Sequence, residues 1–132
     1  MNPIIIFLIS LFATLAATST PVTRHQDGSI TIDTSTLKAS EGRFGPTPLI
    51  IHLDSLERVT GIESLKNVET PSYWRYVIDK LSHAWDGVPA GEVDSVKVDA
   101  ISGATFSSES LISNVRTGIA YYLESKADNN SR

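Results

Sequence analysis

Polar and apolar residues alternate along three short stretches in the first half of the chain, as they do in half-buried β-strands. The stretches are residues 29–33, 49–54 and 58–62. The second stretch is the most regular, and its alternation predicts that Leu49, Ile51 and Leu53 share a buried face. In the third stretch, Gly61 either weakens the strand or marks a bulge.

Apolar residues recur at helical spacing in two stretches of the second half. A first helix is predicted over residues 71–85, because Thr70 is a good N-cap and Pro71 is tolerated at the first helical position. Its apolar face would hold Trp74, Val77, Ile78, Leu81 and Trp85. A second helix is predicted to begin directly after the stretch that ends at Ser108 and to end near Lys126. Its apolar face would hold Leu111, Ile112, Val115, Ile119, Tyr122 and Leu123.

A brief strand is also predicted at residues 95–98, so the expected order of elements is β-β-β-α-β-α. This order predicts the α+β class, with a small, mainly antiparallel sheet packed against two helices. Residues 19–26 read as a loop. The expected divisions are a leader at 1–18, an extension with a short strand at 19–44, a core domain at 45–126 and a polar tail at 127–132.

The leader changes the expected location of the protein. Residues 4–17 are almost wholly apolar and uncharged, but the run is shorter than the ~20 residues of a membrane span. It is typical of a signal peptide or an N-terminal anchor, which predicts export to the periplasm or cell envelope.

Composition and charge narrow the function classes further. The net charge is −4 with acids and bases interspersed, which argues against nucleic-acid binding. There is no cysteine, which excludes disulfides and thiolate metal sites. His25, His52 and His83 lie on separate elements without ligand-like spacing, so no metal site is expected. The Ser35-to-Lys38 match to a penicillin-binding nucleophile pattern lacks its partner motif and is attributed to chance.

The most informative stretch is residues 98–108, where small and hydroxyl-bearing residues lead directly into the second predicted helix. A helix that begins after such a turn leaves backbone N–H groups unpaired, and these groups attract phosphate. Gly103 would let the backbone approach a ligand closely. The alternative is an ordinary helix cap formed by Ser107 or Ser108, and the spacing alone does not decide between the two.

Residues 99–108 resemble the flavinylation motif of the FMN-binding domain family. This family includes the FMN-carrying subunits of sodium-translocating NADH:quinone reductase and of Rnf-type ferredoxin:NAD oxidoreductase. Glu69, Thr70 and Pro71 resemble a Glu-Thr-Pro element that those subunits carry upstream. Gly45 and the strand at 49–54 resemble the start of their core, so the resemblance extends over about residues 45–123.

The resemblance implies an FMN cofactor whose phosphate is esterified to Ser107 by a flavin transferase. The family's usual acceptor is threonine, but a serine oxygen can form the same phosphoester. Non-covalent FMN, held by the 102–105 turn, is the alternative. The implied cofactor-binding residues are Ser107 as the acceptor, Asp99, Ser102, Gly103, Ala104, Thr105, Phe106, Ser108, Glu69, Thr70 and Tyr73. In the transferase interpretation, Asp99 and the 102–105 core are also recognised by the modifying enzyme. Tyr73 and Phe106 are the expected contacts of the flavin ring, whereas the helical spacing of Trp74 favours a core position.

These expectations describe an electron carrier of the cell envelope, with membrane-associated redox partners, more than a self-contained enzyme. Two alternatives stay open at this point. One is a non-covalent FMN-binding sensor or accessory module, and the other is an exported structural domain without a cofactor.

Overall fold

The computed structural model describes residues 20–131, so the predicted leader lies outside the described residues. Four strands form one antiparallel sheet in the order β1-β2-β3-β4. They are β1 (Val22–Arg24), β2 (Ile30–Asp33), β3 (Leu49–Leu53) and β4 (Val59–Ser64). The helices are α2 (Pro71–Leu81), the short 3₁₀ helix η1 (Ala90–Ser95) and the long α3 (Thr105–Asn130). This architecture confirms the α+β class with a small antiparallel sheet.

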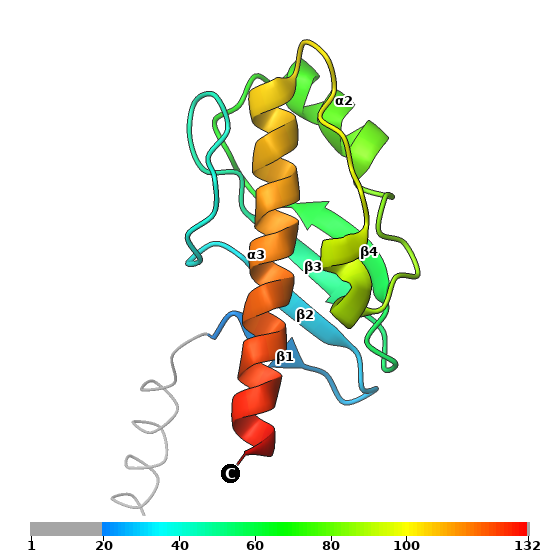
Figure 1. The fold of residues 1–132 in the computed structure, drawn as a ribbon. Coiled ribbons are helices and arrows are strands. Elements are labelled where there is room, and N and C mark those ends of the chain that lie inside the picture. Colours follow the sequence, from blue (N-terminus) through cyan, green and yellow to red (C-terminus); the bar gives the residue numbers. More distant parts are fainter. Residues whose placement is uncertain (1–19, 132) are drawn as a thin grey trace, which may run out of the picture.

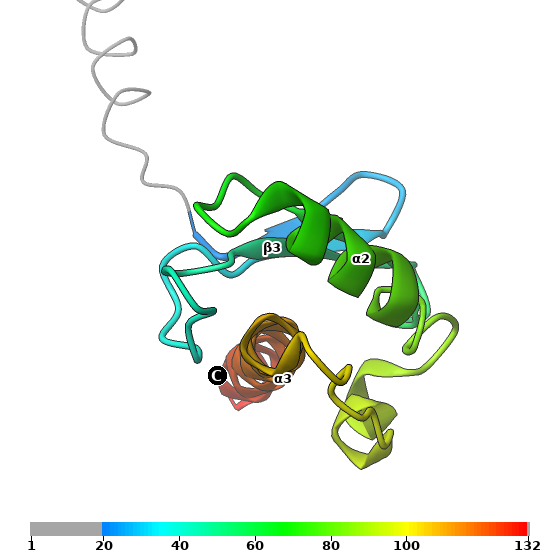
Figure 2. The same ribbon diagram turned by 90° about the horizontal axis from the view of Figure 1, so that it is seen from above.

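Helix α3 lies against one face of the sheet, with α2 and η1 beside it (Figures 1 and 2). The strand alternation places Ile32 and Ile51 on the covered face, where both are fully buried. From α3, Leu111, Val115 and Ile119 pack into the same core, as their helical spacing predicted. The burial of Leu49 and Leu53 beside Ile51 is confirmed as well. The core thus fixes α3 across β2 and β3.

Two strand predictions were wrong. The predicted loop before residue 27 contains β1, whose backbone pairs with β2. Residues 95–98 form no strand, because the 3₁₀ helix η1 extends as far as Ser95. The backbone of 87–90 instead runs beside the start of β4, where Val59 N–H donates to the Val88 carbonyl at 2.9 Å. Val96 and Val98 pack half-buried against the core, so their alternation reflects burial without strand pairing.

The predicted helix ends also need correction. Helix α2 ends at Leu81 and not at residue 85, because the chain tightens there and Ala84 N–H bonds to the Leu81 carbonyl. This turn still brings Trp85 into the core, where it is fully buried. Helix α3 begins at Thr105, before the predicted start after Ser108, and continues through Asn130, beyond the predicted end at Lys126. No glycine or proline interrupts those last polar residues.

The turn between β3 and β4 carries a strained residue that is tied to the far end of α3. Glu57 has a φ of 63°, a left-handed conformation that costs a non-glycine residue about 1 kcal/mol. Its carboxylate accepts hydrogen bonds from the Tyr122 hydroxyl at 2.5 Å and the Lys126 ammonium at 2.8 Å. The hydrogen bonds from Lys126 and then Tyr122 lower the pKa of Glu57. Burial, followed by the contact with Glu57, raises the pKa of Tyr122 to about 12.

The close approach of α3 to the sheet generates a first prediction. A Cβ at Gly118 would lie 2.7 Å from Ile51 Cδ1 and 2.9 Å from Thr34 Cγ2. Alanine normally stabilises a helix relative to glycine, but overpacking should prevail here and destabilise Gly118→Ala by about 1–3 kcal/mol. Urea unfolding measures the change. Gly91→Ala, which meets no atom within 4 Å, is the control and should stay near wild type. A stabilised Gly118→Ala protein would contradict the packing argument.

A second prediction concerns the pH dependence of stability. The folded pKa of Glu57 lies below its ordinary value of 4.5, so its charged form stabilises the fold above pH 4.5. That contribution is lost as the pH falls through the lowered folded pKa. Glu57→Gln should therefore cost up to about 1 kcal/mol at neutral pH and little in strong acid. Unfolding free energies measured at several pH values test this, with the exposed Glu124→Gln as control. A difference that is independent of pH would refute it.

Candidate functional site

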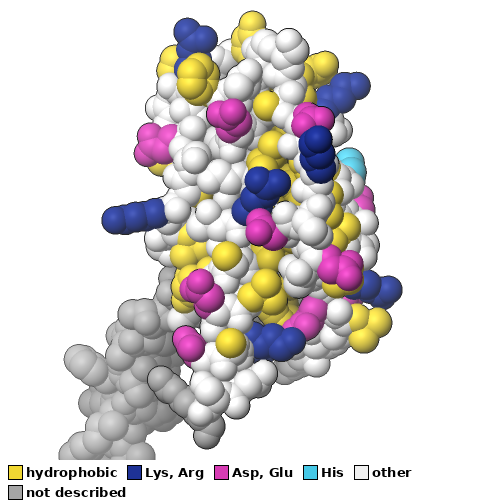
Figure 3. All heavy atoms as spheres, in the orientation of Figure 1, with side chains coloured by type: hydrophobic (Ala, Val, Ile, Leu, Met, Phe, Trp, Pro, Cys, Tyr) yellow, Lys and Arg dark blue, Asp and Glu magenta, His cyan; other side chains and the backbone are white. Residues whose placement is uncertain are grey.

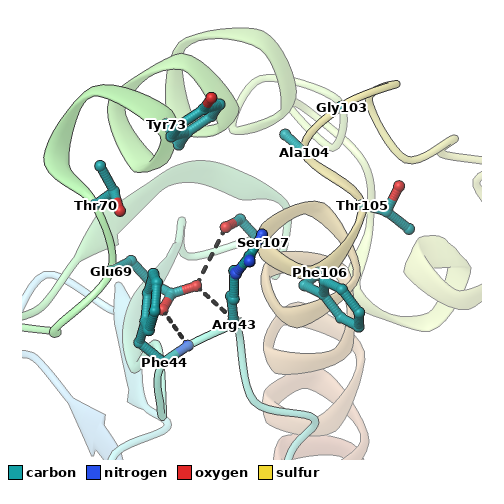
Figure 4. Close-up of a pocket in the computed structure, with 10 residues that line it drawn as sticks. All are labelled: Arg43, Phe44, Glu69, Thr70, Tyr73, Gly103, Ala104, Thr105, Phe106 and Ser107. Atoms are coloured by element: carbon teal, nitrogen blue, oxygen red, sulfur yellow. Dashed lines mark hydrogen bonds between the residues drawn. The ribbon is translucent and has the colours of Figure 1, made fainter.

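A cleft of about 280 Å³ lies where the first turns of α2 and α3 meet the loop before β3. Figure 4 shows its lining residues, which come from these three separate segments. They are Arg43, Phe44, Glu69, Thr70, Tyr73, Gly103, Ala104, Thr105, Phe106 and Ser107. Most of the residues implied by the resemblance therefore converge on one place. The cleft lies at the end of the molecule where α3 begins, remote from the C-terminus (Figure 1).

The turn before α3 leaves the start of that helix uncapped by any side chain. Gly103 has a φ of 83°, a left-handed conformation that suits glycine, and Ala104 N–H bonds to the Ile101 carbonyl at 2.9 Å. Ala104 holds the N-cap position and makes no side-chain cap bond. Ser107 and Ser108 lie inside the first turn, so the interpretation of either residue as the cap is wrong. The first backbone N–H groups of α3 thus have no capping side chain and lie beside the cleft.

Glu69 is the buried centre of the site. Only 5% of its surface is exposed, and its two oxygens accept the Arg43 and Phe44 N–H groups, each at 2.8 Å. The Ser107 hydroxyl donates to Glu69 Oε1 at 3.2 Å. Figure 4 shows these three bonds converging on one carboxylate. The buried acid is therefore satisfied by three donors: two backbone N–H groups and the Ser107 hydroxyl. The resemblance implies that this same hydroxyl is the site of flavin attachment.

Three aromatic side chains border the cleft and stay accessible. Phe44, Tyr73 and Phe106 are 59%, 58% and 62% exposed, respectively. Such rings offer a flat apolar surface of the kind that stacks on a heteroaromatic ligand. Trp74 lies outside the cleft, since it is buried and donates to Ser64 Oγ at 2.8 Å, in agreement with its helical spacing.

Three of the implied residues do not line the cleft. Ser108 is fully buried, and its hydroxyl donates to the Ala104 carbonyl at 2.7 Å and accepts the Ile101 N–H at 3.0 Å. It thereby fastens the 101–104 turn to α3. Ser102 is exposed at the tip of that turn, and Asp99 is exposed on a shallow groove beside α3. Both therefore lie on the surface, outside the cleft.

Sequence reasoning missed Arg43 and Phe44. Both lie in a loop between polar and proline-rich segments, and they are held through backbone N–H groups that any residue would supply. The structure links both residues to Gly42, because a Cβ there would lie 2.0 Å from Glu69 Oε1. A glycine that makes room for a distant acid has no local signature in the sequence.

Comparison with known families agrees with this geometry. A sequence profile described as the FMN-binding domain matches residues 42–120, which is more than half of the chain, so the protein belongs to the FMN-binding domain family. No curated protein and no solved structure gave a significant match. FMN is therefore the cofactor, and the alternative of a structural domain without a cofactor is set aside.

The residues that line the cleft suit the chemistry of FMN. A hydroxyl, an uncapped helix start and an arginine suit the phosphate, and exposed aromatic rings suit the flavin. The cleft's volume of about 280 Å³ lies just below the range of about 300–1,000 Å³ that is usual for small-molecule sites.

A third prediction tests the hydrogen bonds that hold the Glu69 carboxylate. In Gly42→Ala the new methyl group would displace the Glu69 carboxylate from the Arg43 and Phe44 N–H groups. Those two amide protons should then exchange with solvent faster than in wild type, as measured by NMR. Gly61→Ala, where a Cβ meets no atom within 4 Å, is the control. Unchanged exchange at both amides would show that the carboxylate does not hold the loop.

Proposed function

We propose that this protein is an electron carrier of the cell envelope whose FMN is attached through its phosphate to Ser107. The observation that carries the proposal is the position of Ser107. Its hydroxyl lines the FMN cleft at the uncapped start of α3 and is already oriented by Glu69. Among the described residues that line the cleft, Ser107 is the one serine.

Attachment requires a flavin nucleotide in which the FMN phosphate is activated as a pyrophosphate, together with a transferase. Ser107 Oγ forms a bond to that phosphorus, and the pyrophosphate P–O bond breaks. The nucleoside monophosphate leaves with the electron pair. The hydroxyl proton passes to a base, and the Glu69 carboxylate is within hydrogen-bonding range of it. The products are a phosphodiester on Ser107 and a free nucleotide.

Bound FMN supplies one- and two-electron redox chemistry, and the chain positions it. Phe44, Tyr73 and Phe106 offer apolar surface to the ring while leaving the cleft open. Glu69 is the one acid among the described residues that line the cleft, and its oxygens are already engaged. An open flavin without an acid–base pair beside it suits exchange of electrons with protein partners better than turnover of a small substrate.

The redox partners are proposed to be membrane-associated, as the leader suggests. No helix within residues 20–131 is long and apolar enough to cross a bilayer. The apolar run at 4–17 supports export, with or without retention as an anchor. The chain enters the fold at β1, far from the start of α3 in Figure 1. A tether at that end would attach the fold at β1, away from the start of α3 where the cleft lies.

Non-covalent FMN binding is the second candidate, and the burial of Ser107 favours it. Only 8% of this residue is exposed, and its hydroxyl already has a partner in Glu69. A transferase must reach that hydroxyl through the cleft. A sensor or accessory module would need no such access.

A fourth prediction separates the two candidates. The wild-type protein and Ser107→Thr, incubated with a flavin transferase and its nucleotide, should gain the FMN mass in a denaturing mass measurement. Ser107→Ala should gain none, and peptide fragmentation should place the adduct at residue 107. Flavin that binds wild type but leaves in denaturant would establish the non-covalent module. A protein that holds no flavin in either form would contradict the proposed function.

A further inference from the structure

Arg43 supplies the positive charge of the cleft. Of the described residues that line the cleft, Arg43 alone is cationic and Glu69 alone is acidic. No carboxylate within residues 20–131 lies in salt-bridge range of the Arg43 guanidinium. The Arg43 Cζ atom lies 5.8 Å from the centroid of the neighbouring Phe44 ring. The structure thus holds an arginine in the cofactor cleft without an anionic partner among the described residues.

The backbone places this arginine beside the acceptor serine. Arg43 N–H and the Ser107 hydroxyl both donate to the same atom, Glu69 Oε1, at 2.8 and 3.2 Å. Two groups that share one acceptor oxygen are neighbours. Figure 4 shows the Arg43 side chain extending from its loop toward the start of α3, where Ser107 lies. A phosphate on Ser107 would therefore lie within the reach of the guanidinium.

The chemistry of the site calls for such a cation. Esterified Ser107 loses the proton that it donates to Glu69 and gains a negatively charged phosphodiester. The carboxylate of Glu69 is buried, so two negative charges would face each other with little solvent between them. A guanidinium offsets this repulsion, and its planar array of donors matches phosphate oxygens in pairs.

We propose that Arg43 binds the phosphate of FMN and makes the cleft select phosphorylated flavin over riboflavin. The inference rests on the proposed function, because that function places the phosphate at Ser107. Arg43 is a specificity-determining residue in this scheme. Ser107 forms the bond and Glu69 positions Ser107.

The test compares Arg43→Gln with Arg75→Gln, which changes an exposed arginine on α2 that does not line the cleft. Both changes are made in a Ser107→Ala protein, so that no ester forms. Flavin fluorescence quenching measures the affinity for FMN and for riboflavin. Arg43→Gln should weaken FMN binding about tenfold or more, the effect of losing a charge-assisted hydrogen bond, and leave riboflavin binding unchanged. Arg75→Gln should change neither.

An equal loss for both flavins would overturn the proposal, because it would mean that Arg43 contacts the ring or supports the fold. An undiminished preference for FMN would overturn it as well. If the Ser107→Ala protein binds neither flavin measurably, the comparison moves to protein with attached FMN. There Arg43→Gln should shift the phosphorus NMR resonance of the ester, and Arg75→Gln should not. An unshifted resonance refutes the contact.

These outcomes are separable from those of the proposed function. If no adduct forms on Ser107 but Arg43→Gln abolishes the preference for FMN, covalent attachment fails and the role of Arg43 stands. If the adduct forms and its phosphorus resonance is unchanged in Arg43→Gln, attachment stands and the role of Arg43 fails.

Discussion

The site depends on one buried carboxylate. Glu69 lies just before α2, and its oxygens bind the 43–44 backbone and the Ser107 hydroxyl on α3. A buried acid is costly unless donors surround it, so the three segments must stay together for the carboxylate to be satisfied. The cleft is the space that remains beside this junction. The hydrogen bonds to Glu69 therefore hold together the three segments that line the cleft.

A second polar cluster holds the same loop from its other side. Asn114 on α3 accepts from Thr34 Oγ1 at 3.0 Å and donates to Thr47 Oγ1 at 3.2 Å. Thr47 also bonds to Ser110, whose hydroxyl reaches the Ser40 carbonyl. These groups attach the start and the end of the 34–48 segment to one face of α3. The loop that presents Arg43 is thus fastened at both ends by side chains buried among the described elements.

Hydrophobic periodicity was sufficient for the main elements of the fold. It predicted β2, β3, β4, α2 and α3, and Gly61 does lie beside the register shift of the β3–β4 pair. It failed where pairing decides the structure. The three residues of β1 are strand because β2 lies beside them. Residues 95–98 have no strand beside them, and the segment that runs beside the start of β4 is 87–90.

For the candidate site too, local sequence patterns identified some of the residues and missed others. The motif and the Glu-Thr-Pro element lie at helix starts, so local sequence marked most of the cleft. Arg43 and Phe44 join it through contacts with an acid more than twenty residues away, which no local pattern encodes. Figure 3 shows charges of both signs interspersed over the face in view, so a single cation does not stand out among them.

The small and open cleft suits the covalent anchor proposed above. A protein that retains a cofactor by affinity alone must bury most of its surface, since ordering the ligand has to be offset by contacts. A phosphodiester removes that requirement, because the flavin cannot diffuse away whatever its contacts are. The ring can then stay near the surface beside Phe44, Tyr73 and Phe106, where a redox partner can approach it. Electron-transfer partners meet through small and brief interfaces, and an exposed ring suits such encounters. The exposure that would weaken a non-covalent site is what a carrier of this type needs.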